Sequence, residues 1–163
     1  VRSEVGVGTT FTVTIPFEIA PESEVANNEN ENEEQVSLDN VKILLVEDNE
    51  LNREIVKAVL EETGFEVEEA ENGAVAVDKI KTAGALYYDV VLMDIQMPVM
   101  DGYMATKKIR NLEDSDLANI PIIALSANAF EEDRKASADA GMNGHLAKPV
   151  NVSELLKMLC KLF

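Results

Sequence analysis

The chain has 163 residues, of which 46% are hydrophobic and 28% charged, a composition typical of one globular domain with additional segments. Its formal net charge of -17 at pH 7 would repel a phosphate backbone, which argues against nucleic-acid binding. The single cysteine, Cys160, excludes an internal disulfide and fits a reducing compartment such as the cytoplasm. No apolar run is long enough to span a bilayer and no signal peptide opens the chain, so we expect no direct membrane contact. Because the chain begins with valine, we expect it to be a fragment of a longer protein.

Near the start of the chain, the stretch FTVTIPFEI (11–19) alternates apolar and polar residues, which predicts a strand with one buried face. Pro16 suggests that it lies at a sheet edge. A lone strand has no core to bury its face against, so it belongs to a domain whose remainder is absent, or pairs with another copy. Gly6 and Gly8 before it favour a hairpin turn over a phosphate-cradling loop.

An acidic segment follows at residues 21–40, with seven acidic residues and no basic one. It has too little apolar surface to offset the entropy that ordering would cost, so it is predicted to be a solvated linker. We therefore divide the chain into residues 1–20, a linker over 21–40 and a globular domain over 41–163.

Strand-like and helix-like patterns alternate through the globular domain. The predicted strands cover 41–46, 65–69, 88–93, 120–125 and 143–147. Apolar residues keep helical spacing at Leu51, Ile55, Ala58 and Val59, at Ala74, Val77 and Ile80, and at Leu155, Leu156, Leu159 and Leu162. Helix ends are marked by Gly64, Gly84 and Gly141, and the last helix by a capping box of Asn151 and Glu154. Such alternation predicts an α/β fold with a parallel sheet covered by helices on both faces.

One predicted helix, 128–140, has a poor apolar stripe, consisting of Phe130, Ala136 and Ala140. We expect it to be the least firmly packed element and the easiest to shift.

The stretch DVVLMDIQMPVMDG (89–102) places Asp94 at the end of the third predicted strand. Ligands of open parallel sheets bind outside the carboxyl ends of the strands, so this carboxylate is well located for chemistry. It could equally cap the helix that follows. For this residue alone, both interpretations remain open.

Other strand ends carry polar residues as well: Glu47 and Asp48 follow the first strand, Ser126 the fourth, and Lys148 the fifth. If the first and third strands are neighbours, three carboxylates converge, and their mutual repulsion calls for a cation. Mg²⁺ is the natural candidate because it prefers hard oxygen ligands and keeps open positions for water or phosphate. The ammonium of Lys148 and the hydroxyl of Ser126 suit phosphoryl oxygens.

In combination, the motifs LLVEDNELNR, VVLMDIQMPVMDG, PIIALSANA and GHLAKPV resemble those of response-regulator receiver domains over residues 41–163. The resemblance implies a flavodoxin-like, doubly wound (βα)5 parallel sheet with strand order 2-1-3-4-5. It implies that Asp94 accepts a phosphoryl group in a magnesium-dependent reaction, with Mn²⁺ as a possible substitute. It also implies that Mg²⁺ is bound by Asp48, by Glu47 through water and by the backbone carbonyl of Gln96. Ser126 and Lys148 would contact the phosphoryl oxygens, and Ser126 would also act as a switch residue. The resemblance further implies a cis peptide before Pro149.

The stretch SEVGVGTTFTVTIPF (3–17) resembles the closing segment of the ATP-binding domain of sensor histidine kinases. Since only 15 residues follow Lys148, no effector domain is expected, and the chain looks like the C-terminal receiver of a hybrid kinase. The implied partners are the phosphoacceptor domain of the same parent chain and a histidine phosphotransfer protein. The implied location is cytoplasmic, with any membrane anchor of the parent upstream.

One position departs from the family pattern: His145 stands where a switch tyrosine or phenylalanine is usual. It serves either as another flat ring or as a pH-sensitive switch.

Three other functional classes are alternatives to a phosphorylated receiver. A flavodoxin-like cofactor binder should offer Ser, Thr or Gly after its first strand, where this chain has EDNELN. An aspartyl phosphatase carries its nucleophile after its first strand, with a second aspartate two residues further on. In this chain Asp94 follows the third predicted strand, and Gln96 stands two residues after it. A pseudo-receiver would dock partners without being phosphorylated.

Overall fold

A computed structural model describes residues 1–4, 6, 8–10, 12, 41–127 and 130–162 of a chain that divides into two compact units, Val1–Gln35 and Val36–Phe163. In the first unit, strand β1 (Arg2–Glu4) pairs antiparallel with β2 (Gly8–Thr10), and Gly6 between them has a φ of +82°. This agrees with the expected hairpin turn. The predicted strand 11–19, apart from Thr12, and the linker 21–40 lie outside the described residues, so the proposed boundaries at 20 and 40 stay predictions.

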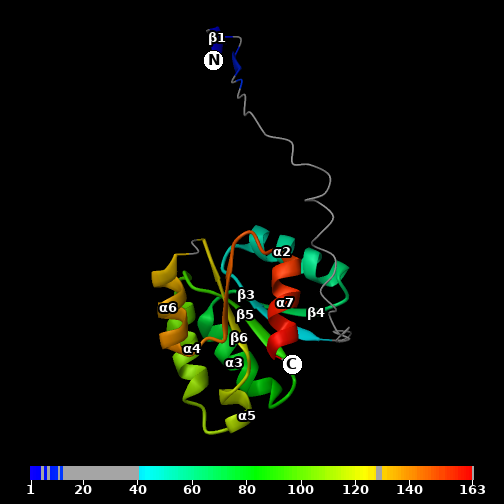
Figure 1. Cartoon of the computed structure of the whole chain (residues 1–163), viewed down its shortest axis with the longest axis vertical. Helices are drawn as coiled ribbons and strands as arrows, with labels where there is room; N and C mark the ends of the chain where they lie inside the picture. Colours follow the sequence, from blue (N-terminus) through cyan, green and yellow to red (C-terminus); the bar gives the residue numbers. More distant parts are fainter. Residues whose placement is uncertain (5, 7, 11, 13–40, 128–129, 163) are drawn as a thin grey trace, which may run out of the picture. The chain divides into compact units, whose positions relative to one another are not determined.

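The second unit is built on a five-stranded parallel sheet (Figure 1). Its strands are β3 (Lys42–Val46), β4 (Glu66–Ala70), β5 (Val90–Asp94), β6 (Ile122–Ser126) and β7 (Gly144–Ala147). They lie in the order β4-β3-β5-β6-β7, which confirms the predicted order 2-1-3-4-5. Because the order reverses between β3 and β5, the ends of these two neighbouring strands open a crevice for ligands.

Helices cover both faces of this sheet (Figure 1). They are α2 (Glu50–Glu62), α3 (Gly73–Ala83), α4 (Gly102–Arg110), α5 (Ser115–Ala118), α6 (Glu131–Ala140) and α7 (Val152–Leu162). The buried residues of α2 and α7 share one core cluster, and those of α3 and α4 share the other. Helix α6 packs beside α4 and β7. Among the described residues, no helix has both the length and the apolar character needed to cross a membrane.

The central strands supply both cores, which explains their unbroken apolar runs. In β3, Ile43 packs toward α2 and α7, whereas its neighbour Leu44 packs toward α3 and α4. In β5, Leu92 likewise packs toward α2 and α7, and Met93 packs toward α3 and α4. These two side chains and those of Ile43 and Leu44 are fully buried. Burying each stabilises the fold by roughly 1.5–3 kcal/mol, which fixes the register of these strands and hence of the residues at their ends.

The apolar stripe of α2 does not enter the core. Leu51, Ile55 and Val59 are 63%, 55% and 37% exposed, and the residue that this helix buries is Leu60. The helical spacing therefore predicted a helix correctly. Its apolar stripe, however, faces solvent and not the core of this unit.

Helix α6 also differs from expectation, because two of the three residues in its predicted stripe are exposed. Phe130 is 68% exposed and Ala136 is exposed as well, whereas the buried residues are Ser137 and Ala140. Its contact with the unit consists of small side chains, one of them polar.

Candidate functional site

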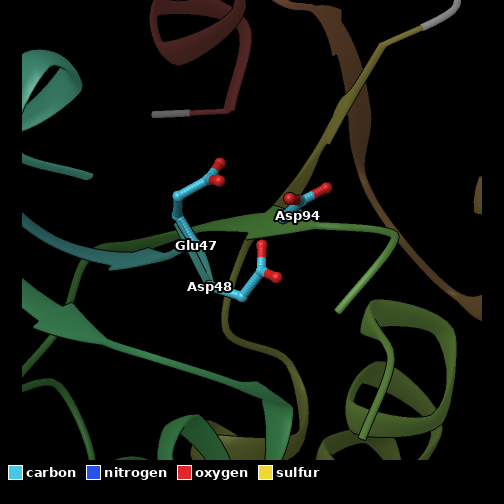
Figure 2. Close-up of side chains that lie close together, drawn as sticks. All are labelled: Glu47, Asp48 and Asp94. Atoms are coloured by element: carbon cyan, nitrogen blue, oxygen red, sulfur yellow. The ribbon is translucent and has the colours of Figure 1, made fainter. Parts of the chain in front are cut away.

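Three carboxylates meet at the carboxyl end of the sheet. Strand β3 pairs with β5 through Val46 and Met93, so that Glu47 and Asp48 emerge beside Asp94. One carboxylate oxygen from each of the three lies within 4.8 Å of the other two. Figure 2 shows the three side chains around a common space. The convergence that the order of the strands implied is thus present.

Lys148, which follows β7, joins this cluster from across the sheet. Its Nζ donates to Asp94 Oδ2 at 2.6 Å and to Glu47 Oε2 at 2.5 Å. Its backbone is held in place because Lys148 N donates to Ser126 O at 2.7 Å. The peptide between Lys148 and Pro149 is cis, as the resemblance implied. One ammonium therefore serves two carboxylates.

Burial sets the electrostatics of the cluster. The side chains of Glu47 and Asp94 are 2% and 8% exposed, and that of Lys148 is 24% exposed. Loss of solvent raises the pKa of Asp94, and the hydrogen bond and charge of Lys148 only partly offset this. Burial also acts to lower the pKa of Lys148, but its bonds to Asp94 and Glu47 outweigh that and raise it. Lys148 thus stays charged, while ionised Asp94 carries a cost that an added cation would relieve.

Asp94 is not a helix cap. Helix α4 is capped by Asp101, whose carboxylate accepts from Met104 N at 2.7 Å, whereas Asp94 Oδ1 accepts from Gln96 N at 3.2 Å. Gly102 lies directly behind Asp94: a Cβ at Gly102 would stand 2.3 Å from Asp94 O. The capping interpretation is therefore wrong, and a glycine is required for α4 to approach the end of β5.

At this edge of the sheet, the strand ends open onto a polar crevice of about 280 Å³. It is lined by Glu47, Asp48, Asp94, Gln96, Ser126 and Lys148, together with residues of the adjoining loops and helices. The structure thus brings together all the residues predicted for metal and phosphoryl contacts. His145 lies behind them, with Nε2 at 2.8 Å from Ser126 Oγ.

Several residues of the site had not been predicted. Asn52 Nδ2 donates to Glu47 Oε1 at 3.2 Å, and Arg53 Nη1 donates to Glu47 O at 2.8 Å. Asp133 of α6 lines the crevice. Asn52 and Arg53 stand in the motif LLVEDNELNR, four and five residues after Asp48, so their position was a usable signal. No signal in the sequence marks Asp133.

The donor set suits a small divalent cation. Carboxylate oxygens are the ligands that Mg²⁺ prefers, and the crevice leaves room for water or a phosphoryl oxygen beside them. Three clustered carboxylates against one ammonium also leave excess negative charge, which a cation would offset. The residues present therefore fit the expected metal.

Comparison with known proteins matches residues 43–160 to the response regulator receiver domain family. The sensor protein EvgS of Escherichia coli is 36% identical over 162 residues, which cover 99% of this chain but 13% of EvgS. The receiver domain of the sensor histidine kinase PA1611 from Pseudomonas aeruginosa, solved with magnesium in its active-site cleft, is 42% identical, with a TM-score of 0.66 over 75% of this chain and 96% of that one. The receiver domain of Ssk1 from Saccharomyces cerevisiae, solved with the histidine phosphotransfer protein Ypd1, is 32% identical, with a TM-score of 0.65 over 73% and 86% of the two chains.

The fold and the acidic crevice define a doubly wound signalling domain of the two-component type. The chain belongs to the response regulator receiver domain family, and among its relatives are hybrid sensor histidine kinases.

Proposed function

We propose that Asp94 accepts a phosphoryl group from a phosphohistidine and that the chain then relays it to a histidine phosphotransfer protein. The observation that carries this proposal is the bond of 2.6 Å between Lys148 Nζ and Asp94 Oδ2 inside a crevice lined by further carboxylates. The ammonium of Lys148 favours the ionised form of Asp94, and a fixed, ionised carboxylate is the oxygen nucleophile that this transfer needs.

In the proposed transfer, an Asp94 oxygen attacks phosphorus in line, the phosphorus–nitrogen bond breaks, and an acyl phosphate forms. The ammonium of Lys148 offsets charge on the phosphoryl oxygens, and the hydroxyl of Ser126 donates to one of them. Asp48, Asp94, Glu47 through water and the carbonyl of Gln96 would hold Mg²⁺, or Mn²⁺ in its place. The metal, when bound, supplies positive charge to the same oxygens.

The partner surface that we assign adjoins this crevice. The exposed side chains of Ile55 and Val59 on α2 line a cavity of about 490 Å³ together with Pro149 and Val150. Lys148 lines both this cavity and the crevice. A phosphohistidine must reach a nearly buried carboxylate, so its carrier has to dock beside the crevice, and an apolar helix face there fits a helical partner. The Ssk1 receiver, a relative of this chain, has been solved with such a phosphotransfer protein.

We also propose that the phosphoryl donor is the phosphoacceptor domain of a parent kinase, of which residues 1–20 are the end of the ATP-binding domain. In support, the match to EvgS covers 99% of the chain and so extends beyond the receiver domain. The expected location of this arrangement is the cytoplasm.

The test is the intact mass of the chain after incubation with acetyl phosphate and Mg²⁺. We expect one phosphoryl group on the wild type and none on Asp94→Asn. A wild type that gains no mass would instead be a pseudo-receiver that docks partners, and steady release of phosphate from small esters would indicate a phosphatase.

The docking surface is tested separately with Ile55→Asp. It should accept phosphate from acetyl phosphate at the wild-type rate but from a phosphorylated histidine phosphotransfer protein at least tenfold more slowly, because only the second reaction needs the surface on α2. The matched control is Met104→Asp on α4, since Met104 is 50% exposed and lies on a helix of the opposite face. Equal slowing in both variants would contradict the assignment.

A further inference from the structure

His145 forms a hydrogen-bonded link between the crevice and helix α6. The residue is only 8% exposed. Its Nε2 lies 2.8 Å from Ser126 Oγ, and its Nδ1 lies 3.1 Å from Ser137 Oγ. Both ring nitrogens are therefore engaged with hydroxyl groups, which a phenylalanine at this position could not be.

The hydroxyl of Ser137 determines where the proton of a neutral ring resides. A serine hydroxyl has one proton, and Ser137 Oγ donates it to Asp133 O at 2.9 Å. Ser137 Oγ must then accept from His145, which places the ring proton on Nδ1. The Nε2 atom of the neutral ring carries a lone pair and accepts the hydroxyl proton of Ser126.

This arrangement conflicts with the role of Ser126 in the phosphorylated state. Ser126 lines the same crevice as Asp94, and its hydroxyl would donate to a phosphoryl oxygen there. Once that single proton points to the phosphoryl group, the serine oxygen faces the lone pair of His145 Nε2. The contact becomes favourable again when Nε2 carries a proton of its own.

We propose that His145 is a positioning residue that directs the hydroxyl proton of Ser126, so that phosphorylation of Asp94 and uptake of a proton by His145 Nε2 favour each other. The inference rests on the proposed phosphorylation of Asp94. It goes beyond that proposal because it couples the reaction to a second protonation site. Ser126 keeps its proton throughout, and the ring takes one proton from solvent.

The charged groups on the elements around the ring are exposed, are engaged elsewhere, or carry the negative charge that favours a protonated imidazole. On α6, Asp133 is the one charged residue that is not exposed, and it lines the crevice. On α4, Lys107 and Lys108 are exposed, and the guanidinium of Arg110 donates to backbone carbonyls. At the ends of β5 and β7, Asp94 and Lys148 pair with each other. A phosphoryl group adds negative charge to this balance, and a charged imidazole offsets part of it.

The link also reaches helix α6. The bond from Nδ1 to Ser137 is retained when the ring becomes charged, and a hydrogen bond from a charged donor is stronger than one from a neutral donor. Ser137 is one of the two buried residues of α6, so this bond lies where the helix is attached to the unit. Phosphorylation would therefore tighten the attachment of α6 through His145.

The experiment uses the imidazole ¹⁵N spectrum of the chain, in which His145 is the single histidine. Spectra are recorded from pH 5.5 to 8.5 in Mg²⁺, with and without beryllofluoride as the phosphoryl analogue. We expect Nδ1 to be protonated throughout in both samples. Nε2 should lose its proton at a pH at least one unit higher in the loaded sample, which corresponds to at least tenfold coupling. Asp94→Asn should show no difference between the two samples.

A second measurement is the affinity for beryllofluoride as a function of pH. Uptake of one proton predicts that this affinity changes by up to about tenfold per pH unit between the two titration midpoints. The reference is His145→Phe, which keeps an aromatic ring but lacks the two nitrogens. Equal pH dependence in wild type and His145→Phe would overturn the inference, as would a loaded ring that is neutral with its proton on Nε2. If acetyl phosphate adds no mass to the chain, the proposed function fails and this inference with it; if mass is added and His145 does not respond, the inference alone fails.

Discussion

Replacing Lys148 by methionine removes the ammonium that lies between Asp94 and Glu47 and leaves two buried carboxylates facing each other. Breaking a buried ion pair typically costs about 3–5 kcal/mol. The side chain of Lys148 is 24% exposed, so water relieves part of the loss, and we expect about 2–3 kcal/mol at pH 7 without divalent cations. At about 4 °C per kcal/mol for a domain of this size, the midpoint of thermal unfolding should fall by roughly 8–12 °C.

The loss should depend on pH, and its sign follows from Asp94. The pKa of Asp94 is raised in the fold by burial, so ionised Asp94 destabilises the fold above that pKa, and the cost disappears as the pH falls through it. Lys148 acts against this shift, so the pKa of Asp94 should rise further in Lys148→Met. The difference in stability between the variant and the wild type should therefore shrink from pH 7 to pH 5. Mg²⁺ should shrink it as well, because a cation replaces the missing charge.

The assay is urea unfolding followed by far-ultraviolet circular dichroism, at pH 7 and pH 5, with and without Mg²⁺. Lys108→Met is the matched control, because Lys108 is an exposed lysine of α4, and it should change stability by less than about 0.5 kcal/mol. A loss below about 1 kcal/mol for Lys148→Met, or the same loss at both pH values, would refute the reasoning that Lys148 offsets the buried carboxylates.

Three further predictions concern the frame of the site. Gly102→Ala should destabilise the chain by about 2 kcal/mol and slow labelling by acetyl phosphate, because its Cβ would meet Asp94 O; unfolding and mass measurements check this. Val99→Gly should raise the thermal midpoint by the equivalent of about 1 kcal/mol, since Val99 has a φ of +68° and is 83% exposed, and an unchanged or lower midpoint would contradict it. Arg110→Lys should cost about 2 kcal/mol in urea unfolding, because a lysine cannot replace the guanidinium bonds to Gly141 O and to two other carbonyls.

The sheet and its polar rim were predictable because both follow from local pattern. Strands such as 41–46 and 88–93 are apolar on both faces, which distinguishes a buried parallel strand from a half-exposed one. The predicted ends differ from β3 and β5 by at most two residues. Since parallel strands end at one edge, placing Asp94 and Lys148 after their strands was enough to bring them together without any knowledge of the distances.

Other features were not predictable, because they depend on which way an element turns once it is packed. The spacing of Leu51, Ile55 and Val59 is the same whether the stripe meets a core or solvent, and here it is exposed. The contacts of His145 join residues 19 and 8 positions away, on a strand and on a helix, and no periodicity encodes them. No helical pattern was recognised for α4 and α5, which span only nine and four residues.

The cost of the acidic cluster and the exposure of α2 have a common explanation. A chain optimised for stability alone would pair each buried carboxylate and bury each apolar stripe, whereas here Lys148 is shared by Glu47 and Asp94 and the stripe around Ile55 stays exposed. Under the proposed function, the excess negative charge favours binding of a metal ion, and the exposed stripe offers a partner protein a surface to bind. The exposed stripe lies on α2 beside the crevice, whereas the link through His145 leads to α6. In the proposed scheme, a partner docked on α2 delivers the phosphoryl group and α6 responds to it, so delivery and response use different helices.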